Sequence, residues 1–195
     1  MPKQKSKVPT PVKERIILAA SELIRQADGD LAGVSLRSIA QEAGVALGLI
    51  NYHFGSKEKL VEECVQRIIS GVIDAFKPGN CVSGSPAACL GAVAAEVMEY
   101  LAAHPAMARV SILGDMASPG ARDNTMRTVA GFAGLPGVPQ DKMRLFCFTA
   151  ALQAAFLRKD SGGEGCGFAL NNKEERDAFV RSLAEMVFPA ENGQI

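Results

Sequence analysis

The sequence predicts an all-α protein in which a small three-helix domain is followed by a larger helical domain. Apolar residues recur at spacings of three and four along almost every segment, the spacing of one helix face. Glycine and proline separate these segments, and no segment shows the alternation of a half-buried strand. With 195 residues, of which 48% are hydrophobic, the chain is long enough to bury a core.

The amino end is predicted to be a flexible arm followed by a helix. Residues 1–10 are polar and basic, so they cannot bury enough apolar surface to order themselves. Thr10 and Pro11 form a helix start, because a threonine hydroxyl accepts from a first-turn amide and proline loses no useful donor there. Asp28 and Gly29 end this helix. Its apolar stripe comprises Ile16, Ile17, Ala20, Leu23, Ile24 and Ala27.

Two short helices follow, joined by a turn. Ser35 caps the first of them, and Gly44 supplies the left-handed conformation that the turn requires. The second runs from about Ala46 to His53. This is the geometry that places one helix in the major groove of DNA. The spacing also occurs in unrelated helical proteins, so by itself it leaves the function open.

Ser56 is expected to cap a fourth helix, whose wide apolar stripe ends before Pro78. We expect a helix-turn-helix domain over residues 11–56 and a second helical domain over residues 57–195. A glycine-rich loop is expected over residues 161–167. The remaining helices are predicted at residues 86–104, 106–117, 122–133, 140–159 and 174–188.

The formal charge is zero but unevenly distributed. Residues 1–60 carry nine Lys and Arg against six Asp and Glu, a net +3, and residues 61–195 carry twelve against fifteen, a net −3. This bias suits a polyanionic partner at the amino end. No window reaches the roughly eighteen apolar residues of a membrane span, and the start lacks the apolar run of a signal peptide. We therefore expect a cytoplasmic protein without a membrane partner.

The cysteines and histidines do not predict catalysis. Five scattered cysteines without a CxxC pair favour reduced thiols, with Cys64, Cys89 and Cys147 in the core and Cys81 and Cys166 in loops. The two histidines lie in separate predicted domains, and no nucleophile–base pair, phosphate loop or metal-ligand spacing is present. We expect no catalytic residue, metal or cofactor. An enzyme built in the helical bundle is the alternative of a different class.

Residues Leu36–Val45, then Gly48, then Tyr52–Leu60 resemble the amino-terminal domain of the tetracycline-repressor (TetR) family. The resemblance covers roughly Val12 to Phe76. It implies a homodimer that binds a palindromic operator in double-stranded DNA through three helices. It further implies a repressor released by a small-molecule inducer. The alternatives are a regulator of the same fold that acts without a ligand or is controlled by a protein partner.

The resemblance also implies residue roles. Ser35 and Arg37 would meet phosphates, Ala46 and Gly48 would face bases, and Tyr52, His53 and Lys57 would hold the DNA backbone. The corresponding alternatives are a helix cap for Ser35, a solvated charge for Arg37 and Lys57, and packing against the first helix for Tyr52 and His53. The basic arm could reach the minor groove or merely solubilise the chain.

Base readout is expected to be sparse. Asn51 is the residue best able to pair with adenine, although many TetR members have tyrosine at this position. Leu47 and Leu49 stand where the family often carries polar residues. Specificity would then depend on Asn51, on apolar contacts with thymine and on DNA shape.

The carboxyl half is expected to hold the dimer seam and a ligand pocket. Leu145–Leu157 is apolar nearly all round, so it should be buried, either at a seam with a second copy or within its own core. The last helix would complete the seam with Phe179, Leu183, Met186 and Val187. Candidate pocket walls are Met98, Leu101, Met107, Ile112, Met116, Met126, Phe132 and Met143, and candidate polar anchors are His104, Arg109, Asp115 and Arg127.

Overall fold

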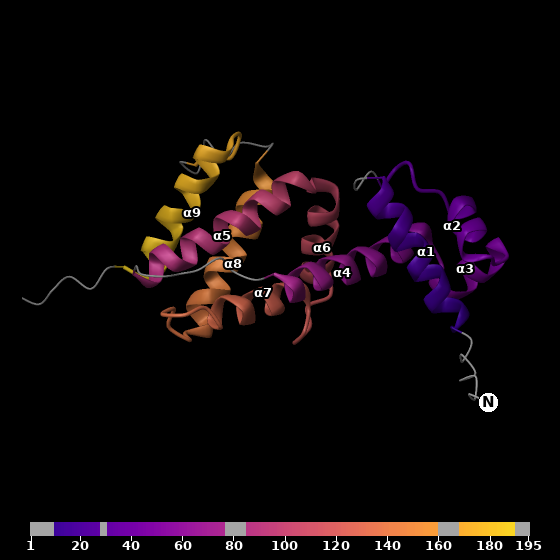
Figure 1. Cartoon of the computed structure of the whole chain (residues 1–195), viewed down its shortest axis with the longest axis horizontal. Coiled ribbons are helices and arrows are strands. Elements are labelled where there is room, and N and C mark those ends of the chain that lie inside the picture. The colour runs from indigo at the N-terminus through magenta and orange to yellow at the C-terminus, as the bar shows by residue number, and fades with distance from the viewer. Residues whose placement is uncertain (1–9, 28–30, 77–84, 160–167, 190–195) are drawn as a thin grey trace, which may run out of the picture. The chain divides into compact units, whose positions relative to one another are not determined.

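The computed structural model describes residues 10–27, 31–76, 85–159 and 168–189, and its regular structure within these ranges is entirely helical (Figure 1). The predicted all-α fold is confirmed, with helix bounds within a few residues of those expected. The basic arm, Asp28 and Gly29, Pro78, the 161–167 loop, Cys81 and Cys166 lie outside the described residues. The helices are α1 (Val12–Gln26), α2 (Leu36–Ala43), α3 (Leu47–Phe54), α4 (Lys57–Ala75), α5 (Pro86–Ala103), α6 (Pro105–Ala117), α7 (Asn124–Ala133), α8 (Lys142–Arg158) and α9 (Lys173–Val187).

The chain divides into two compact units, Met1–Ile68 (unit 1) and Ile69–Ile195 (unit 2). The division falls inside α4, further along the chain than the boundary after residue 56 that the sequence suggested. The first half of α4 belongs to unit 1 because it supplies apolar side chains to the same core as α1. Leu60 and Val65 of α4 are fully buried in that unit.

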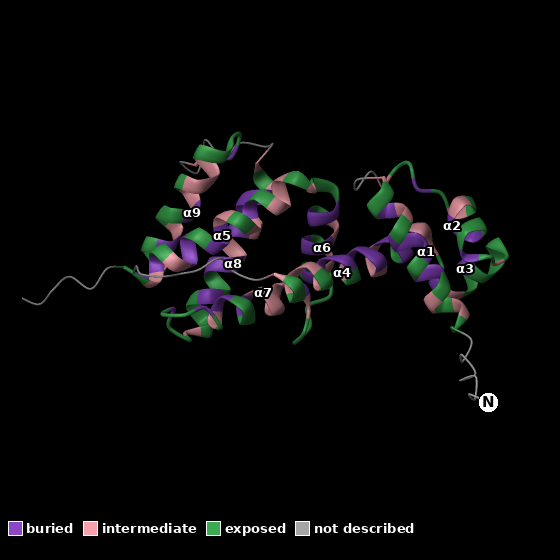
Figure 2. Ribbon diagram, in the orientation of Figure 1, coloured by how far each residue is buried: buried purple, intermediate pink, exposed green. Residues whose placement is uncertain are grey.

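Unit 1 is built on a small aliphatic core. Ile16 and Ile24 of α1, Ile39 of α2 and Ile50 of α3 are at most 1% exposed. Each of these residues lies on the inward face of its helix, and the opposite faces are solvent-exposed (Figure 2). Two helices as short as α2 and α3 gain little stability on their own, so this shared core holds them in place.

The start of α1 differs from the expectation. Pro11 is the N-cap residue, with an extended backbone, and no side chain caps the helix. The expected cap by the Thr10 hydroxyl is therefore wrong. Thr10 lies one residue before the capping position, too early in the chain to serve the first-turn amides. The Pro11 carbonyl instead accepts from the amide of Arg15 at 3.0 Å.

Unit 2 contains α5 to α9 and the second half of α4. α5 and α9 are its most extensively packed pair, and small residues allow their close approach. A Cβ atom added at Gly91 of α5 would lie 3.7 Å from the Cβ of Ala184 of α9. Among the described helices, α5 alone is long and apolar enough to span a membrane, and its buried residues, such as Leu90 and Met98, pack in the core of unit 2.

Only one face of α8 packs into this core. Leu145, Phe148 and Leu152 are buried, and the Phe148 ring meets the Phe132 ring edge to face at 5.6 Å. Met143 and Phe146 are exposed on the same helix. Within one chain, α8 is therefore not buried on all sides. The apolar residues beyond the core stripe form a second apolar face.

The cysteines depart from the expectation in two places. Cys64 is buried as expected and Cys147 is exposed, both as free thiols. Cys147 is not a core residue because Leu145 and Phe148 occupy the inward stripe of α8, and a residue between them points elsewhere. Cys89 is disulfide-bonded rather than reduced. Sequence spacing does not report which sulfur atoms a fold brings within bonding distance.

Candidate functional site

The amino end of α2 is fixed by a reciprocal pair of serines. The Ser35 hydroxyl accepts from the amide of Ser38 at 3.0 Å, and the Ser38 hydroxyl accepts from the amide of Ser35 at 3.2 Å. The expected cap at Ser35 is confirmed. It satisfies two amides that the first turn would otherwise leave unpaired. Arg37 projects from this turn as an exposed side chain.

The turn between α2 and α3 depends on Gly44. Its φ of 62° and ψ of 43° lie in the left-handed region, where a Cβ atom is strained. The turn is closed by the amide of Val45, which donates to the carbonyl of Ala40 at 3.0 Å. Arg15 of α1 donates through Nη2 to the carbonyls of Ala43 and Gly44, at 2.5 and 2.9 Å. Sequence reasoning missed Arg15, because no local pattern links it to a turn 28 residues away.

α3 exposes one face and buries the other. Ile50 and Phe54 are buried, while Gly48, Asn51 and Tyr52 are exposed. Tyr52 is the most exposed large hydrophobic side chain of the described residues, at 82%. A Cβ atom added at Gly48 would meet nothing within 4 Å, so the space beside this glycine is open. The exposed face is a ridge that a partner can approach closely.

The ridge carries little formal charge. Leu47 and Leu49 are each 39% exposed, and α3 contains no Lys, Arg, Asp or Glu. His53 is partly buried, and its ring meets the Tyr52 ring edge to face at 5.1 Å. Phe54 is a core residue, and Lys13 of α1 lies over its ring at 5.3 Å. Because Tyr52 is so exposed, it points outward rather than packing against α1.

The start of α4 adds a second polar edge to unit 1. The Ser56 hydroxyl accepts from the amide of Lys59 at 3.3 Å, which confirms its role as a cap. Lys57 is partly exposed directly beside it. Hydrogen bonds from its own backbone amide and from Ser56 hold the pKa of the Glu58 carboxyl below its usual range. An ionised acid therefore stands next to the lysine.

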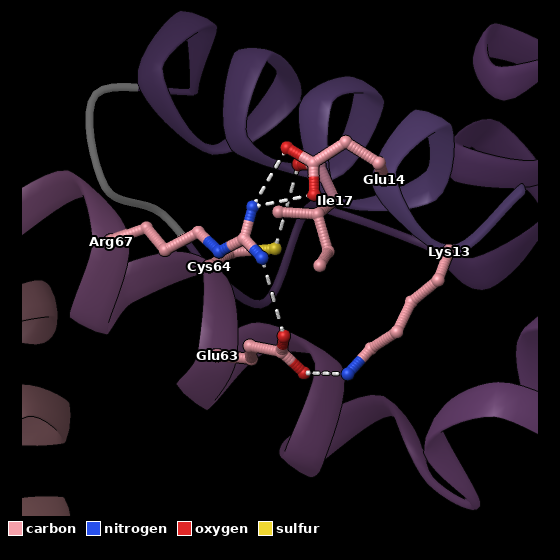
Figure 3. Close-up of polar contacts among 6 residues, drawn as sticks. All are labelled: Lys13, Glu14, Ile17, Glu63, Cys64 and Arg67. Atoms are coloured by element: carbon pink, nitrogen blue, oxygen red, sulfur yellow. Dashed lines mark hydrogen bonds and ion pairs between the residues drawn. The ribbon is translucent and has the colours of Figure 1, made fainter. Parts of the chain in front are cut away.

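Polar contacts fasten the first half of α4 to α1 (Figure 3). Arg67 donates through Nη1 to both carboxylate oxygens of Glu14, each at 2.9 Å. Lys13 forms an ion pair with Glu63 at 3.0 Å, and Glu63 also faces Arg67 at 3.6 Å. These charges alternate in sign, so each is flanked by an opposite charge. The network ties α1 to the first half of α4 within unit 1.

The structure leaves every residue of the expected DNA interface at least partly exposed, and all of them belong to unit 1. His53 and Lys57 are partly buried, and the others are exposed. None is lost to the core, so each remains available to a ligand. These residues are Ser35, Arg37, Ala46, Gly48, Asn51, Tyr52, His53 and Lys57.

Unit 2 contains a cavity of about 410 Å³. This volume lies within the range of sites for small organic ligands. Its walls are mostly aliphatic and aromatic. Ile69, Val72 and Ile73 of α4 form one wall, and residues of α5, α6, α7 and α8 complete it.

Hydrogen-bonded polar groups close one side of the cavity. The Asp115 carboxylate of α6 accepts through Oδ2 from the amide and hydroxyl of Thr125, at 2.7 and 2.8 Å. The Thr125 hydroxyl in turn accepts from the Gln153 amide of α8 at 2.9 Å. Asn124 donates to the Ser111 hydroxyl at 3.1 Å. The network ties α6, α7 and α8 together around the cavity.

The predicted pocket is only partly the observed cavity. Leu101, Ile112, Phe132 and the anchor Asp115 line it. The other predicted walls, Met98, Met107, Met116, Met126 and Met143, and the anchors His104, Arg109 and Arg127, do not. Met98 and Met107 are core residues, and Met116 and Met143 are exposed. Sequence reasoning missed the wall formed by α4, because these residues read as an ordinary core stripe.

Part of the surface of unit 2 is apolar. Met143 and Met186 are 74% and 71% exposed, and Phe146 is 46% exposed. Arg144 of α8 donates to the carbonyl of Val187 of α9 at 3.3 Å. Met143 and Met186, the sequence neighbours of these two residues, therefore lie at the same end of the α8 and α9 pair. Exposed side chains of this size on adjoining helices are typical of an interaction surface.

In the described ranges, no group of three or more His, Cys, Asp or Glu comes together as a metal site.

Known proteins share this architecture. Residues 16–64 match the family model of bacterial regulatory proteins of the tetR family. A TetR transcriptional regulator from Rhodococcus sp. RHA1 is 19% identical with a TM-score of 0.56, over 90% of this chain and 94% of its own. The multidrug binding protein EbrR, complexed with imidazole, is 20% identical with a TM-score of 0.57, over 95% and 99%. At these identities the structural likeness shows the fold alone. No curated protein sequence matches significantly.

Proposed function

We propose that this chain, a member of the tetR family of bacterial regulatory proteins, is a homodimeric transcriptional repressor that a small molecule releases from its operator. The observation that carries the proposal is the exposed ridge of α3. Ile50 and Phe54 anchor the helix in the core, and Gly48, Asn51 and Tyr52 face solvent. A short exposed helix on a rigid support is what entry into the major groove requires.

The interface residues divide into two groups by chemistry. Arg37 and Lys57 supply charge for phosphates, and Tyr52 and His53 can each donate to a phosphate oxygen. Ala46 and Gly48 allow close approach to the bases, and Asn51 has the donor and acceptor pair that matches adenine. Ser35 acts first as a helix cap, so its contribution to phosphate binding runs through the amides of the α2 turn.

Release by a ligand is supported by the cavity in unit 2. Its α4 wall belongs to the same continuous helix that is ion-paired to α1 in unit 1. A ligand that favours one position of this helix over another would change the operator affinity by its difference in affinity for the two. A regulator of the same fold without a ligand, or under a protein partner, is the competing proposal.

A homodimer is supported by the apolar surface of α8 and α9. Two recognition helices reach successive turns of a palindrome only when a two-fold axis holds them about 34–36 Å apart. Met143, Phe146 and Met186 would form part of an isologous seam with the same residues of a second copy. We place the protein in the cytoplasm, where operator DNA lies.

Selection of bound fragments from the source genome, followed by gel shifts at physiological salt, tests the DNA proposal. We expect enrichment of a palindromic site and a clear preference for it over random DNA of equal length. Binding without preference at any salt concentration would exclude a sequence-specific regulator. Melting-temperature shifts across a metabolite library would then separate ligand control from control by a partner.

Two substitutions separate backbone contacts from base contacts. Lys57→Ala should weaken binding to every sequence alike and reduce the salt slope by roughly one unit, because one phosphate contact is lost. Asn51→Ala should change base preference at one position and cost about 1–3 kcal/mol there. Gel shifts on the operator and its single-base variants measure both. Uniform losses for both variants would remove Asn51 as a base reader.

A further inference from the structure

The charged residues among the described walls of the cavity in unit 2 are all acidic. Two acidic residues line it, Glu96 of α5 and Asp115 of α6. Among the described lining residues there is no Lys, Arg or His. Arg127 of α7 neighbours the lining residue Thr128 but does not itself line the cavity. It forms an ion pair with Asp74.

This distribution disfavours an anionic ligand. A carboxylate or phosphate that enters an apolar cavity loses its hydration, and only a positive charge or several donors can replace it. The described walls offer no cation, and a bound anion would also face the Asp115 carboxylate. Repulsion between like charges is much less screened in a protein interior than in water.

Asp115 is held where it can act on a ligand. Only 6% of its surface is exposed, and its position is fixed through Oδ2 by the amide and hydroxyl of Thr125. Gln153 braces the Thr125 hydroxyl from α8. A carboxylate fixed in this way is preorganised, so a ligand does not have to order it on binding. Aliphatic walls on α4 and α6 leave most of the ligand surface in apolar contact.

We propose that the cavity takes a largely apolar organic cation, with Asp115 as its principal counter-charge and Glu96 as a second acidic group. This inference rests on the proposed function, since it names the chemical class of the small molecule that releases the repressor. The apolar body supplies most of the affinity by burial against Ile69, Val72 and Phe132. The charge supplies selection between ligands of the same shape.

A series with one skeleton and three charges tests the proposal. We would titrate the full-length protein at pH 7 with 4-phenylbutylamine, 4-phenylbutan-1-ol and 4-phenylbutyrate by calorimetry. The amine should bind roughly ten- to a hundred-fold more tightly than the alcohol, the gain of a charge-assisted hydrogen bond, and the carboxylate should bind weakest. An equal or reversed order, or no binding by any of the three, would overturn the proposal.

Variants identify the acid responsible. Asp115→Asn keeps an oxygen acceptor for Thr125 and should lower the affinity for the amine roughly ten-fold while leaving that for the alcohol unchanged. Glu96→Gln, at an exposed residue, tests the second acid without risk to folding. Glu185→Gln, at an exposed position of α9 that does not line the cavity, is the matched control and should have no effect. Amine selectivity that survives both cavity variants would refute the assignment.

Operator binding is measured in parallel on the same preparations. Protein that binds its operator but prefers the carboxylate would refute the charge assignment and leave the repressor proposal standing. Protein that prefers the amine but binds no operator would refute the repressor proposal and leave the charge assignment standing. The two failures are therefore distinguishable.

Discussion

The Cys64 thiol lies between α1 and α4 with no exposed surface, and it donates to the carbonyl of Ile17 at 3.7 Å. Burial raises its pKa to about 11, because the thiolate would lose its hydration there. The thiol was expected in the core from its apolar neighbours, and that prediction is confirmed.

The raised pKa of Cys64 predicts a pH dependence of stability. The folded protein holds this proton more tightly than the unfolded chain, where the thiol has its ordinary pKa of 9.0. The stabilisation is therefore fully present below pH 9 and is lost between pH 9 and pH 11, by at most roughly 2–3 kcal/mol. Urea denaturation of the wild type and of Cys64→Ala across this range measures it. Parallel curves for the two proteins would contradict the prediction.

Single residues also show where sequence reasoning stops. The caps at Ser35 and Ser56 could be predicted because a cap acts on its own first turn. The clamp of Arg15 on the Gly44 turn could not, since it depends on how α1 lies against α2. The same holds for Cys89 and Cys147, whose states depend on tertiary neighbours and helix rotation.

α3 offers a test that separates folding from DNA binding. Gly48→Ala should stabilise unit 1 by about 0.5–1 kcal/mol, because alanine favours the helix and the added Cβ meets nothing within 4 Å. The same methyl group should weaken operator binding if the duplex backbone approaches α3 closely. Gly71→Ala of α4 is the control, since its site is equally open. It should add stability without changing the operator affinity. Unchanged operator affinity in Gly48→Ala would place this residue outside the interface.

The contact between α1 and α4 predicts a measurable coupling. Arg67 binds both oxygens of Glu14, and both side chains are only partly exposed, at 46% and 39%. A double-mutant cycle with Arg67→Ala and Glu14→Ala should give a coupling free energy of about 0.5–1 kcal/mol that falls with added salt. The Arg25–Glu22 pair, at 3.6 Å on the surface of α1, is the control and should couple less. Equal coupling in the two pairs would mean that the contact of Arg67 Nη1 with both carboxylate oxygens adds nothing here.

At the scale of the whole molecule, the apolar surface of α8 and α9 predicts assembly. Phe146→Asp should convert a dimer into a monomer and lower operator affinity at least ten-fold, because a buried seam cannot hold an unpaired charge. Leu113→Asp on α6 is the control, with a side chain of similar exposure at 44%, and it should remain dimeric. Sedimentation velocity measures the two species. Equal sedimentation of the two variants as dimers would place the seam elsewhere.

The fold and the two sites were predictable to different degrees. The helices followed from apolar spacing and from glycine and proline, which act locally. The proposed interface residues followed from a resemblance in a contiguous stretch, and all of them remain at least partly exposed in the structure. The cavity was harder to predict, because its walls come from five helices. The sequence pattern around a methionine in such a helix is the same whether the side chain fills the core, like Met98, or faces solvent, like Met143.

α4 runs without interruption from Lys57 to Ala75, although the compact units divide at Ile68 and Ile69. A fragment that ends at this division would stop inside a helix and leave its last carbonyls without partners. Chimaeras that join unit 1 to the second unit of another protein of this fold should therefore keep the helix in register, since one inserted residue rotates everything downstream by about 100°. In this protein the division between the two units lies within continuous secondary structure rather than in a loop.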